Sequence, residues 1–228
     1  MGFPVTHLPS VFSSEEIGHI LRYGLFHFRP LENTPANLKL MDDRFSLFTE
    51  IIEPAITESL PREFKIKGGF LNKSSVPYIL HTDGARFVDE KVICTVLLPL
   101  EIESECAGSI QLSAGRLYVF DQRCSLATLL RMGRNPISAF SYRDASSKQH
   151  YEEMLIGFTG QEFSDEEVLS DCSHLRQEEF FGLSLKAKLP WTIGDCILFD
   201  PHHVHASSNF KDLGIRSKTN LVYSLIAP

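Results

Sequence analysis

The sequence predicts an α+β domain whose core is a β-sandwich or a β-barrel. Two observations support this prediction: helical patterns dominate the first 62 residues, and many short strand-like segments follow Pro61. A chain of 228 residues also suits one domain whose core is large enough to need no disulfides. We therefore expect a single domain over residues 1–228, with an N-terminal helical part at 1–62, a β core at 63–120 and 183–228, and an insertion at 121–182.

Two helices are expected in the N-terminal part. Ser13 and Glu16 match a capping box, in which each side chain bonds the other residue's backbone N–H, and apolar residues then follow at helical spacing to an end near Gly24. A second helix is expected over 43–60, where apolar residues recur at spacings of three and four. Pro54 should kink or split that helix.

The β core is expected to contain about seven or eight strands, recognised by alternating or β-branched apolar residues. They cover 64–71, 78–83, 91–100, 109–112 with 115–120 as a hairpin, 183–189, 196–199 and 218–226, and residues 190–195 predict a turn.

The insertion at 121–182 has a weaker strand pattern. We expect one or two short helices there, one of them beginning at a second capping box formed by Ser164 and Glu167. Long insertions in compact domains are often functional lids, so we expect this segment to close over a site.

Composition limits the partners and the compartment. Lys and Arg total 22 and Asp and Glu total 29, a net charge of −7 that argues against nucleic acid as the main partner. The five cysteines follow no regular spacing and form no CxxC pair, which is typical of a reducing compartment, so a cytoplasmic location is expected. No apolar run is long enough to span a membrane, and no secretory signal is recognised.

His81 and Asp83 are the first candidate metal ligands. In a strand, residues i and i+2 project from the same face, so this imidazole and this carboxylate would lie side by side at a spacing that suits two ligands of one ion. A His-x-Asp pair is common by chance, so the prediction needs a second, independent motif.

Three histidines supply that motif: His202, His203 and His205 follow the predicted strand at 196–199, where a barrel mouth would lie. Two histidines and one carboxylate form the facial triad of non-haem Fe(II) oxygenases, which leaves positions open for substrate and O₂.

With these residues the sequence resembles the Fe(II)/2-oxoglutarate-dependent oxygenases, whose core is a double-stranded β-helix. The family places its second histidine after a Gly-Asp turn and a strand, and the matching spacing of eleven residues from Gly194 selects His205. It places a basic residue on the last core strand, which is Arg216 or Lys218 here. Apolar residues following Lys218 favour it, whereas arginine is the better bidentate partner of a carboxylate, so Arg216 stays open. The resemblance covers roughly 64–225, with the insertion unmatched.

The resemblance implies an enzyme in which His81, Asp83 and His205 hold Fe(II). 2-Oxoglutarate would chelate the iron and extend its far carboxylate to Lys218 or Arg216, with Tyr78 as a further hydrogen-bonding candidate. With O₂, the implied reaction is hydroxylation with release of succinate and CO₂. The substrate expected is a small molecule or a side chain of unidentified structure, and the oligomeric state is not predicted.

Several neighbouring residues have two interpretations each. One of His202 and His203 is a pocket residue or both are loop residues, Asn72 binds co-substrate or serves a turn, Arg86 meets substrate or solvent, and Trp191 packs a turn. Two rival functions also remain: a cupin-like metal enzyme of another reaction class and a non-catalytic β-barrel binding module. A cupin would usually carry a denser ligand cluster around His81 than the sequence has.

Overall fold

The computed structural model describes residues 2–34, 36–83, 92–105, 113–124, 128–131, 142–144 and 155–228. Its strands are β1 (Thr6–Leu8), β2 (Arg29–Asn33), β3 (Asn37–Met41), β4 (Lys65–Ser74), β5 (His81–Thr82), β6 (Val92–Ser104), β7 (Ser113–Arg123), β8 (Thr128–Arg131), β9 (Tyr142–Asp144), β10 (Leu185–Thr192), β11 (Cys196–Phe199), β12 (His203–Ser207) and β13 (Ile215–Ile226). Its helical segments are α1 (Ser14–His27), a π-helical turn (Phe48–Ile52), α2 (Glu53–Ile56), α4 (Glu166–Asp171) and 3₁₀ turns at Thr57–Ser59, Gln177–Phe180 and Phe210–Leu213. Within these ranges, no helix has the length and apolar character needed to cross a membrane.

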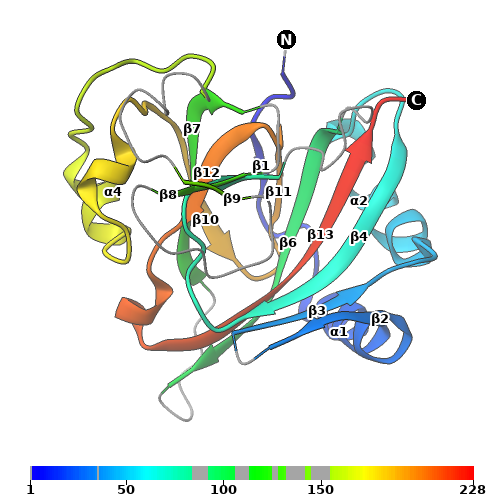
Figure 1. Cartoon of the computed structure of the whole chain (residues 1–228). Helices are drawn as coiled ribbons and strands as arrows, with labels where there is room; N and C mark the ends of the chain where they lie inside the picture. The colour runs from blue at the N-terminus through cyan, green and yellow to red at the C-terminus, as the bar shows by residue number, and fades with distance from the viewer. Residues whose placement is uncertain are drawn as a thin grey trace.

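Two sheets form the core and confirm the predicted double-stranded β-helix (Figure 1). Sheet A has the order β1-β11-β6-β13-β4-β3-β2, and sheet B has the order β10-β7-β12-β5-β8-β9. Neighbouring strands are antiparallel, except for the parallel pair β8 and β9. The long strands β4, β6 and β13 lie side by side in sheet A, and β4 and β13 carry Asn72 and Lys218.

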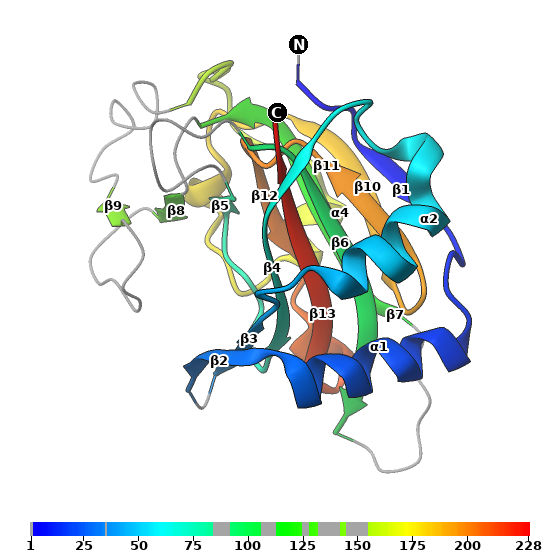
Figure 2. The ribbon, with the colours of Figure 1, turned by 90° about the vertical axis from the view of Figure 1, so that its right-hand side faces the viewer.

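Strand β13 shows how the two faces of sheet A differ. Leu221, Tyr223 and Leu225 belong to the apolar core beneath the N-terminal helices, whereas Lys218 and Asn220 alternate with them and face sheet B. Helices α1 and α2 cover the outer face of sheet A (Figure 2). The N-terminal helices therefore cover the outer face of sheet A. The polar side chains of β13 lie on its inner face, toward sheet B.

Helix α1 begins as predicted. The Ser13 backbone N–H donates to Glu16 Oε2 at 2.8 Å, and the Glu16 N–H donates to Ser13 Oγ at 3.3 Å, which completes the capping box. The helix continues past the predicted end near Gly24 to His27.

The helical stretch predicted over 43–60 is split near Pro54, as expected, but it is not a regular α-helix. This stretch is a π-helical turn, then the one-turn helix α2, then a 3₁₀ turn. Pro54 lies in the first turn of α2, where its missing N–H and its ring disrupt the hydrogen bond to the preceding turn. The chain accommodates the proline by changing helix type at that point.

Three strands lie within the part predicted as helical. Strand β1 pairs with β11, and β2 and β3 extend sheet A beyond β4. In β3, Leu38 and Leu40 pack into the helix-side core, while Lys39 alternates with them and lies on the opposite face. The segment is too short for its alternation to stand out from the surrounding sequence.

Residues 155–182 of the insertion pack on the outer face of sheet B. Phe163, Val168 and Phe180 join an apolar cluster with Tyr118 and Phe120 of β7. The predicted cap of α4 is wrong by one residue, because Asp165 rather than Ser164 accepts the Val168 N–H, at 3.1 Å. Residues 132–141 and 145–154 lie outside the described part of the chain, so the lid role remains a prediction for them.

Candidate metal centre and co-substrate pocket

Strands β5 and β12 place two histidines opposite each other. His205 pairs with His81 in the antiparallel register of the two strands, and their ring centroids are 4.1 Å apart. The histidine cluster was expected just past a strand end, but His203–Ser207 is itself a strand, between β7 and β5 in sheet B. This strand turns His205 toward the space between the sheets.

The Gly-Asp turn feeds the chain into β11 and then β12. Gly194 has a φ of +87°, and a Cβ there would lie 2.7 Å from the Phe12 carbonyl oxygen, so both conformation and space require glycine. Asp195 accepts from the Ser10 backbone N–H at 2.9 Å and lies 2.7 Å from His7 Nε2. The N-terminal segment thus holds this turn in place.

His81, Asp83 and His205, the three candidate ligands, lie close together. Asp83 Oδ1 lies 3.8 Å from His81 Nε2, and its Oδ2 lies 3.4 Å from His205 Nε2. One ligand atom from each residue lies within 4.8 Å of the other two. Bonds of about 2.1 Å to one ion place pairs of ligand atoms roughly 3–4 Å apart, so the cluster is close to the arrangement that one ion requires.

Backbone carbonyls orient both imidazoles. His81 Nδ1 lies 2.7 Å from the Ile79 carbonyl oxygen, and His205 Nδ1 lies 2.9 Å from the His203 carbonyl oxygen. A carbonyl oxygen can only accept, so each Nδ1 carries the proton and each Nε2 presents a lone pair. This is the tautomer in which histidine binds a metal through Nε2.

The charges in the cluster also suit a cation. Burial, together with the nearby His205, lowers the pKa of His81 to about 4, so its imidazole is neutral at pH 7. Burial acts to raise the pKa of Asp83, but His205, His81 and Lys39 outweigh it and lower this pKa to about 2. At neutral pH the cluster therefore offers the neutral imidazole of His81 and the carboxylate of Asp83.

The turn between β11 and β12 positions Asp83. The Asp83 backbone N–H donates to the Pro201 carbonyl oxygen at 2.8 Å. Beside it, the buried carboxylate of Asp200 accepts from Arg123 Nη2 at 2.6 Å and from the His202 backbone N–H at 3.0 Å. These interactions of Asp200 stabilise the turn between β11 and β12. The Pro201 carbonyl oxygen, which accepts from the Asp83 backbone N–H, belongs to that turn.

His202 and His203 lie outside the three-residue cluster. His202 Nδ1 is 2.8 Å from Asp200 Oδ1, which makes His202 part of the turn. His203 is buried, and burial, with Lys186, lowers its pKa. Its Nδ1 has no hydrogen-bond partner among the described residues.

The structure separates the two candidate anchors. Residues two apart in a regular strand lie on the same face, but β13 has a bulge at Arg216: Ile215 and Ser217 lie opposite the adjacent residues Ser104 and Glu103. Arg216 is exposed, whereas Lys218 is only 3% exposed. The bulge therefore leaves Lys218 as the inward-facing base.

Lys218 lies in an aromatic environment. Its Nζ is 4.9 Å from the ring centroid of Trp191 and 5.2 Å from that of Phe210. In the described part of the chain no carboxylate pairs with it, and burial lowers its pKa to about 7. Trp191, predicted to pack a turn, instead lies in β10, and its ring contacts the ammonium group of Lys218.

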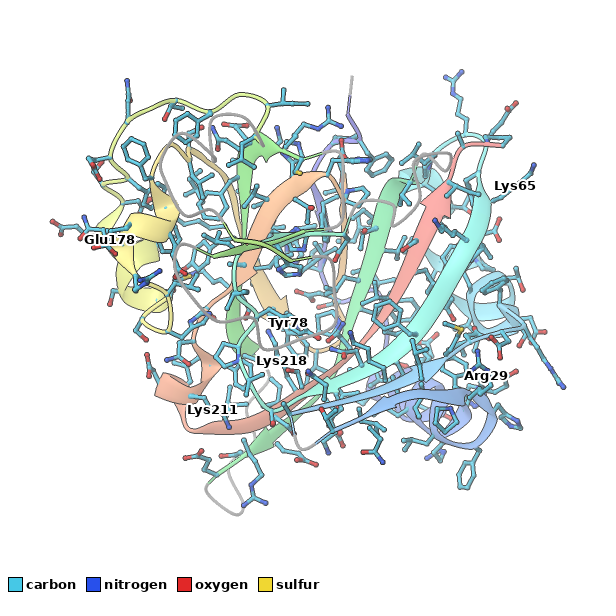
Figure 3. The ribbon with its side chains drawn as sticks, viewed as in Figure 1. Arg29, Lys65, Tyr78, Glu178, Lys211 and Lys218 are labelled. Atoms are coloured by element: carbon cyan, nitrogen blue, oxygen red, sulfur yellow. The ribbon has the colours of Figure 1, made fainter. Side chains whose placement is uncertain are left out.

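Tyr78 joins the lysine pocket to the histidine cluster. Its ring lies 5.4 Å from that of His81, and its hydroxyl donates to Asn72 Oδ1 at 3.2 Å. Asn72 in turn lies directly opposite Asn220. Figure 3 labels Tyr78 and Lys218, which lie close together in that view. Asn72 is thus a buried residue of strand β4 rather than a turn residue.

Sequence reasoning missed several residues of this region. Lys39 lies near the cluster, and His174 of the insertion binds the Tyr78 carbonyl oxygen through Nε2 at 3.1 Å. The alternation of Lys39 with two leucines is the sequence pattern that could have identified Lys39. No local pattern in the sequence identifies His174. Arg86 lies outside the described residues.

No protein-family model and no curated protein sequence matches this chain. Solved structures do match it. One is the epimerase SnoN in complex with Fe³⁺, α-ketoglutarate and nogalamycin RO, with 15% identity, coverage of 96% of this chain and 78% of that chain, and a TM-score of 0.52. Another is the non-haem α-ketoglutarate-dependent carbocyclase SnoK from nogalamycin biosynthesis, with 10% identity, coverage of 98% and 80%, and a TM-score of 0.51. At these identities the likeness establishes the fold, which is that of the Fe(II)/2-oxoglutarate-dependent oxygenases.

Proposed function

We propose that this chain, which has the fold of the Fe(II)/2-oxoglutarate-dependent oxygenases, is itself such an enzyme and hydroxylates its substrate. The observation that carries the proposal is the His81, Asp83 and His205 cluster, whose ligand atoms lie within 4.8 Å of one another between the two sheets. Two imidazoles and one carboxylate on one face suit Fe(II) and leave positions for other ligands.

The donor set supports the metal. Both Nδ1 atoms are engaged by backbone carbonyls, so His81 and His205 present Nε2 without rearrangement. His205 is held further by the ring of Phe199, whose centroid lies 4.9 Å away. We propose that these two histidines and Asp83 hold the ion.

The co-substrate fits the buried lysine. A lone ammonium group in an apolar pocket is costly, and a carboxylate from outside the chain would relieve that cost. Lys218 is such a group, in a pocket formed with Trp191 and Phe210. We propose that Lys218, rather than Arg216, binds the far carboxylate of 2-oxoglutarate, with Tyr78 beside it.

When bound, Fe(II), 2-oxoglutarate and O₂ would supply the oxidation, in which 2-oxoglutarate becomes succinate and CO₂ and a substrate C–H becomes C–OH. The chain's own contribution is positioning and exclusion of water. The apolar walls around Lys218 strengthen its charge-assisted bond, and the Pro201 carbonyl keeps the Asp83 backbone in place. SnoN and SnoK are described as an epimerase and a carbocyclase, so hydroxylation is the part of the proposal that needs direct product analysis.

We also propose a cytoplasmic location. Cys94, Cys124, Cys172 and Cys196 are free and buried. Unpaired cysteines are typical of proteins in a reducing compartment.

Anaerobic spectroscopy tests the enzyme class. Fe(II) with 2-oxoglutarate should give the weak visible absorption of the chelate on the wild-type protein. Asp83→Ala should lose it, because one of three ligands is removed. Asp43→Ala is the matched control, since that carboxylate is half exposed in a surface ion pair with Arg29.

Turnover gives the second measurement. Under air, the wild-type protein should convert 2-oxoglutarate to succinate slowly even without substrate, and Asp83→Ala should not. An iron-loaded wild-type protein that gives neither the absorption band nor succinate would refute the proposal. Mass spectrometry of the turned-over substrate then distinguishes added oxygen from loss of hydrogen alone.

A further inference from the structure

The segment that follows α4 meets the turn that carries Phe210. The Asn209 backbone N–H donates to the Asp171 carbonyl oxygen at 2.6 Å, and Asn209 Nδ2 donates to Ser173 Oγ at 2.9 Å. Phe210 follows directly in this turn, and its ring centroid lies 5.2 Å from Lys218 Nζ. The insertion therefore supports the turn whose aromatic ring lies against Lys218.

His174, in the same segment, reaches the main chain at Tyr78. Its Nε2 lies 3.1 Å from the Tyr78 carbonyl oxygen, and the Tyr78 backbone N–H donates to Ser207 Oγ on β12 at 2.9 Å. The next residue, Ile79, supplies the carbonyl oxygen that lies 2.7 Å from His81 Nδ1. The insertion and β12 therefore both hold the backbone that leads from Tyr78 into the metal cluster.

Stability alone does not explain a histidine at position 174. A carbonyl oxygen can only accept, so Nε2 of His174 carries the proton and its Nδ1 is left as an acceptor. This Nδ1 is buried and has no hydrogen-bond partner in the part of the chain that the structure describes. A buried polar atom without a partner destabilises a fold, so an apolar side chain would pack here more favourably. The bond to Tyr78 is the interaction that accounts for the imidazole.

Electrostatics also place His174 beside the lysine pocket. Burial lowers the pKa of His174, the bond to the Tyr78 carbonyl opposes this change, and the positive charge of Lys218 lowers the pKa further. The imidazole is therefore neutral at pH 7. It lies close enough to Lys218 for that charge to act on it.

We propose that His174 is a positioning residue for 2-oxoglutarate, which acts by fixing the Tyr78 main chain beside the co-substrate pocket. This inference rests on the proposed function. The bond from His174 keeps the Tyr78 ring against that of His81, at 5.4 Å, and the Tyr78 hydroxyl on Asn72. Residues 171–174 of the insertion serve in this way as a brace for the pocket. Without the bond the Tyr78 segment moves more freely, which weakens co-substrate binding while every metal ligand remains.

Co-substrate affinity measures the effect. The Kd of 2-oxoglutarate is obtained by anaerobic titration of the Fe(II)-loaded protein, followed by the visible absorption of the chelate. His174→Phe keeps an aromatic ring but removes the donor, and it should raise this Kd by about threefold to tenfold, the loss expected for one hydrogen bond. The affinity for Fe(II) alone should not change. His174→Gln, whose amide N–H can donate to the same carbonyl, should keep the Kd within about twofold of the wild-type value.

A double-mutant cycle with Tyr78→Phe tests the route of the effect. If His174 acts through Tyr78, the effect of His174→Phe on the Kd should shrink when the Tyr78 hydroxyl is already absent. Two independent effects on the pocket would instead add.

Phe163→Leu is the matched control within the insertion. Phe163 packs against Phe120 and Phe180 in an apolar cluster, so its truncation should lower the Tm but leave the Kd of 2-oxoglutarate unchanged. His174→Leu replaces His174→Phe if the larger ring prevents folding. Trp191 is the only tryptophan of the chain and lies 4.9 Å from Lys218 Nζ, so its fluorescence gives a second measure of co-substrate binding on the same samples.

The outcomes separate the two proposals. If wild-type protein forms no chelate and 2-oxoglutarate leaves the fluorescence of Trp191 unchanged, the proposed function fails. If wild-type protein binds 2-oxoglutarate but His174→Phe keeps the Kd, the inference is overturned while the function stands. The same conclusion follows if Phe163→Leu or His174→Gln raises the Kd as much as His174→Phe does, or if the effects in the cycle with Tyr78→Phe are additive.

Discussion

Lys218 is buried to 3% exposure beneath two aromatic rings, and no carboxylate in the described residues pairs with it. Burial disfavours the charged form, which explains a pKa of about 7 in place of the usual value above 10. An isolated residue of this kind destabilises the fold unless a ligand offsets its cost. The position is therefore better explained by binding than by stability.

Co-substrate affinity should depend on pH through this lysine. Below pH 7 the ammonium form is present and binds the carboxylate, whereas above pH 7 the free protein must first take up a proton. The Kd for 2-oxoglutarate should rise by up to about tenfold per pH unit above 7, measured by titration of the Ni(II)-loaded protein. Lys218→Arg should shift this dependence to higher pH, and an unchanged profile would contradict the assignment.

The free energy of unfolding should also depend on pH through Lys218. It should rise with pH, whereas the affinity for 2-oxoglutarate should fall. The unfolded chain keeps Lys218 protonated to about pH 10.4, so the unfolded state binds more protons than the folded state between pH 7 and 10, and unfolding free energy rises with pH there. Lys218→Met should stabilise the protein at pH 6 by on the order of 2 kcal/mol while abolishing co-substrate binding. Urea denaturation at pH 6 and pH 9 measures this, and the gain should shrink at the higher pH.

The sequence named His81, Asp83 and His205 as candidates, because the His-x-Asp pair and the spacing from Gly194 are local patterns. It could not separate Arg216 from Lys218. Strand parity treats them alike, and the bulge that turns one outward depends on the pairing of β13 with β6. Lys39 was missed because the alternating pattern of β3 is short, and its position near the cluster depends on the pairing of β3 with β4.

For the turn at Gly194, we predict how a substitution changes the free energy of unfolding. A side chain there meets both a positive φ and the Phe12 carbonyl oxygen at 2.7 Å. Gly194→Ala should lower the unfolding free energy by about 1–3 kcal/mol or more, because both penalties apply. Gly214→Ala is the control, since Gly214 has a φ of +69° but nothing within 4 Å of its added Cβ. Equal losses in the two variants, measured by thermal denaturation, would show that the close approach costs nothing.

The core strands were predictable because their residues are largely apolar or β-branched in continuous runs, as in β6 and β11. Strand β12 was not predictable, because Pro201 and His202 precede it and two further histidines interrupt its apolar pattern. The helix after Asp43 was overpredicted, since Pro54 changed the helix type without removing the apolar periodicity. Tertiary pairing, rather than local preference, decided these cases.

The whole molecule assembles the site from distant segments. His81 and His205 lie on paired strands although 124 residues separate them in sequence, and Lys218 comes from a third strand. Sequence patterns predicted the fold class, because helices followed by many short strands allow few architectures. They could not predict how residues 155–182 pack, since their apolar residues fit either a lid or, as found, a cover for sheet B.

Ligands that bind across these segments should stabilise the entire fold. Ni(II) with 2-oxoglutarate at 100 times its Kd adds about 2.7 kcal/mol, which for a domain of this size raises the Tm by roughly 5–10 °C. Scanning calorimetry with metal, with co-substrate and with both should give the largest shift for both together. Asp83→Ala should remove most of it, and a full shift in that variant would contradict the ligand assignment.

The pairing of β1 with β11 has a consequence for how the protein is handled. Strand β11 is Cys-Ile-Leu-Phe with all four residues buried, and β1 is its outer neighbour in sheet A. Removing the first ten residues would leave an apolar edge with open backbone hydrogen-bonding groups, a template for association with other chains. A shortened N-terminus should therefore yield aggregates before it yields an inactive monomer.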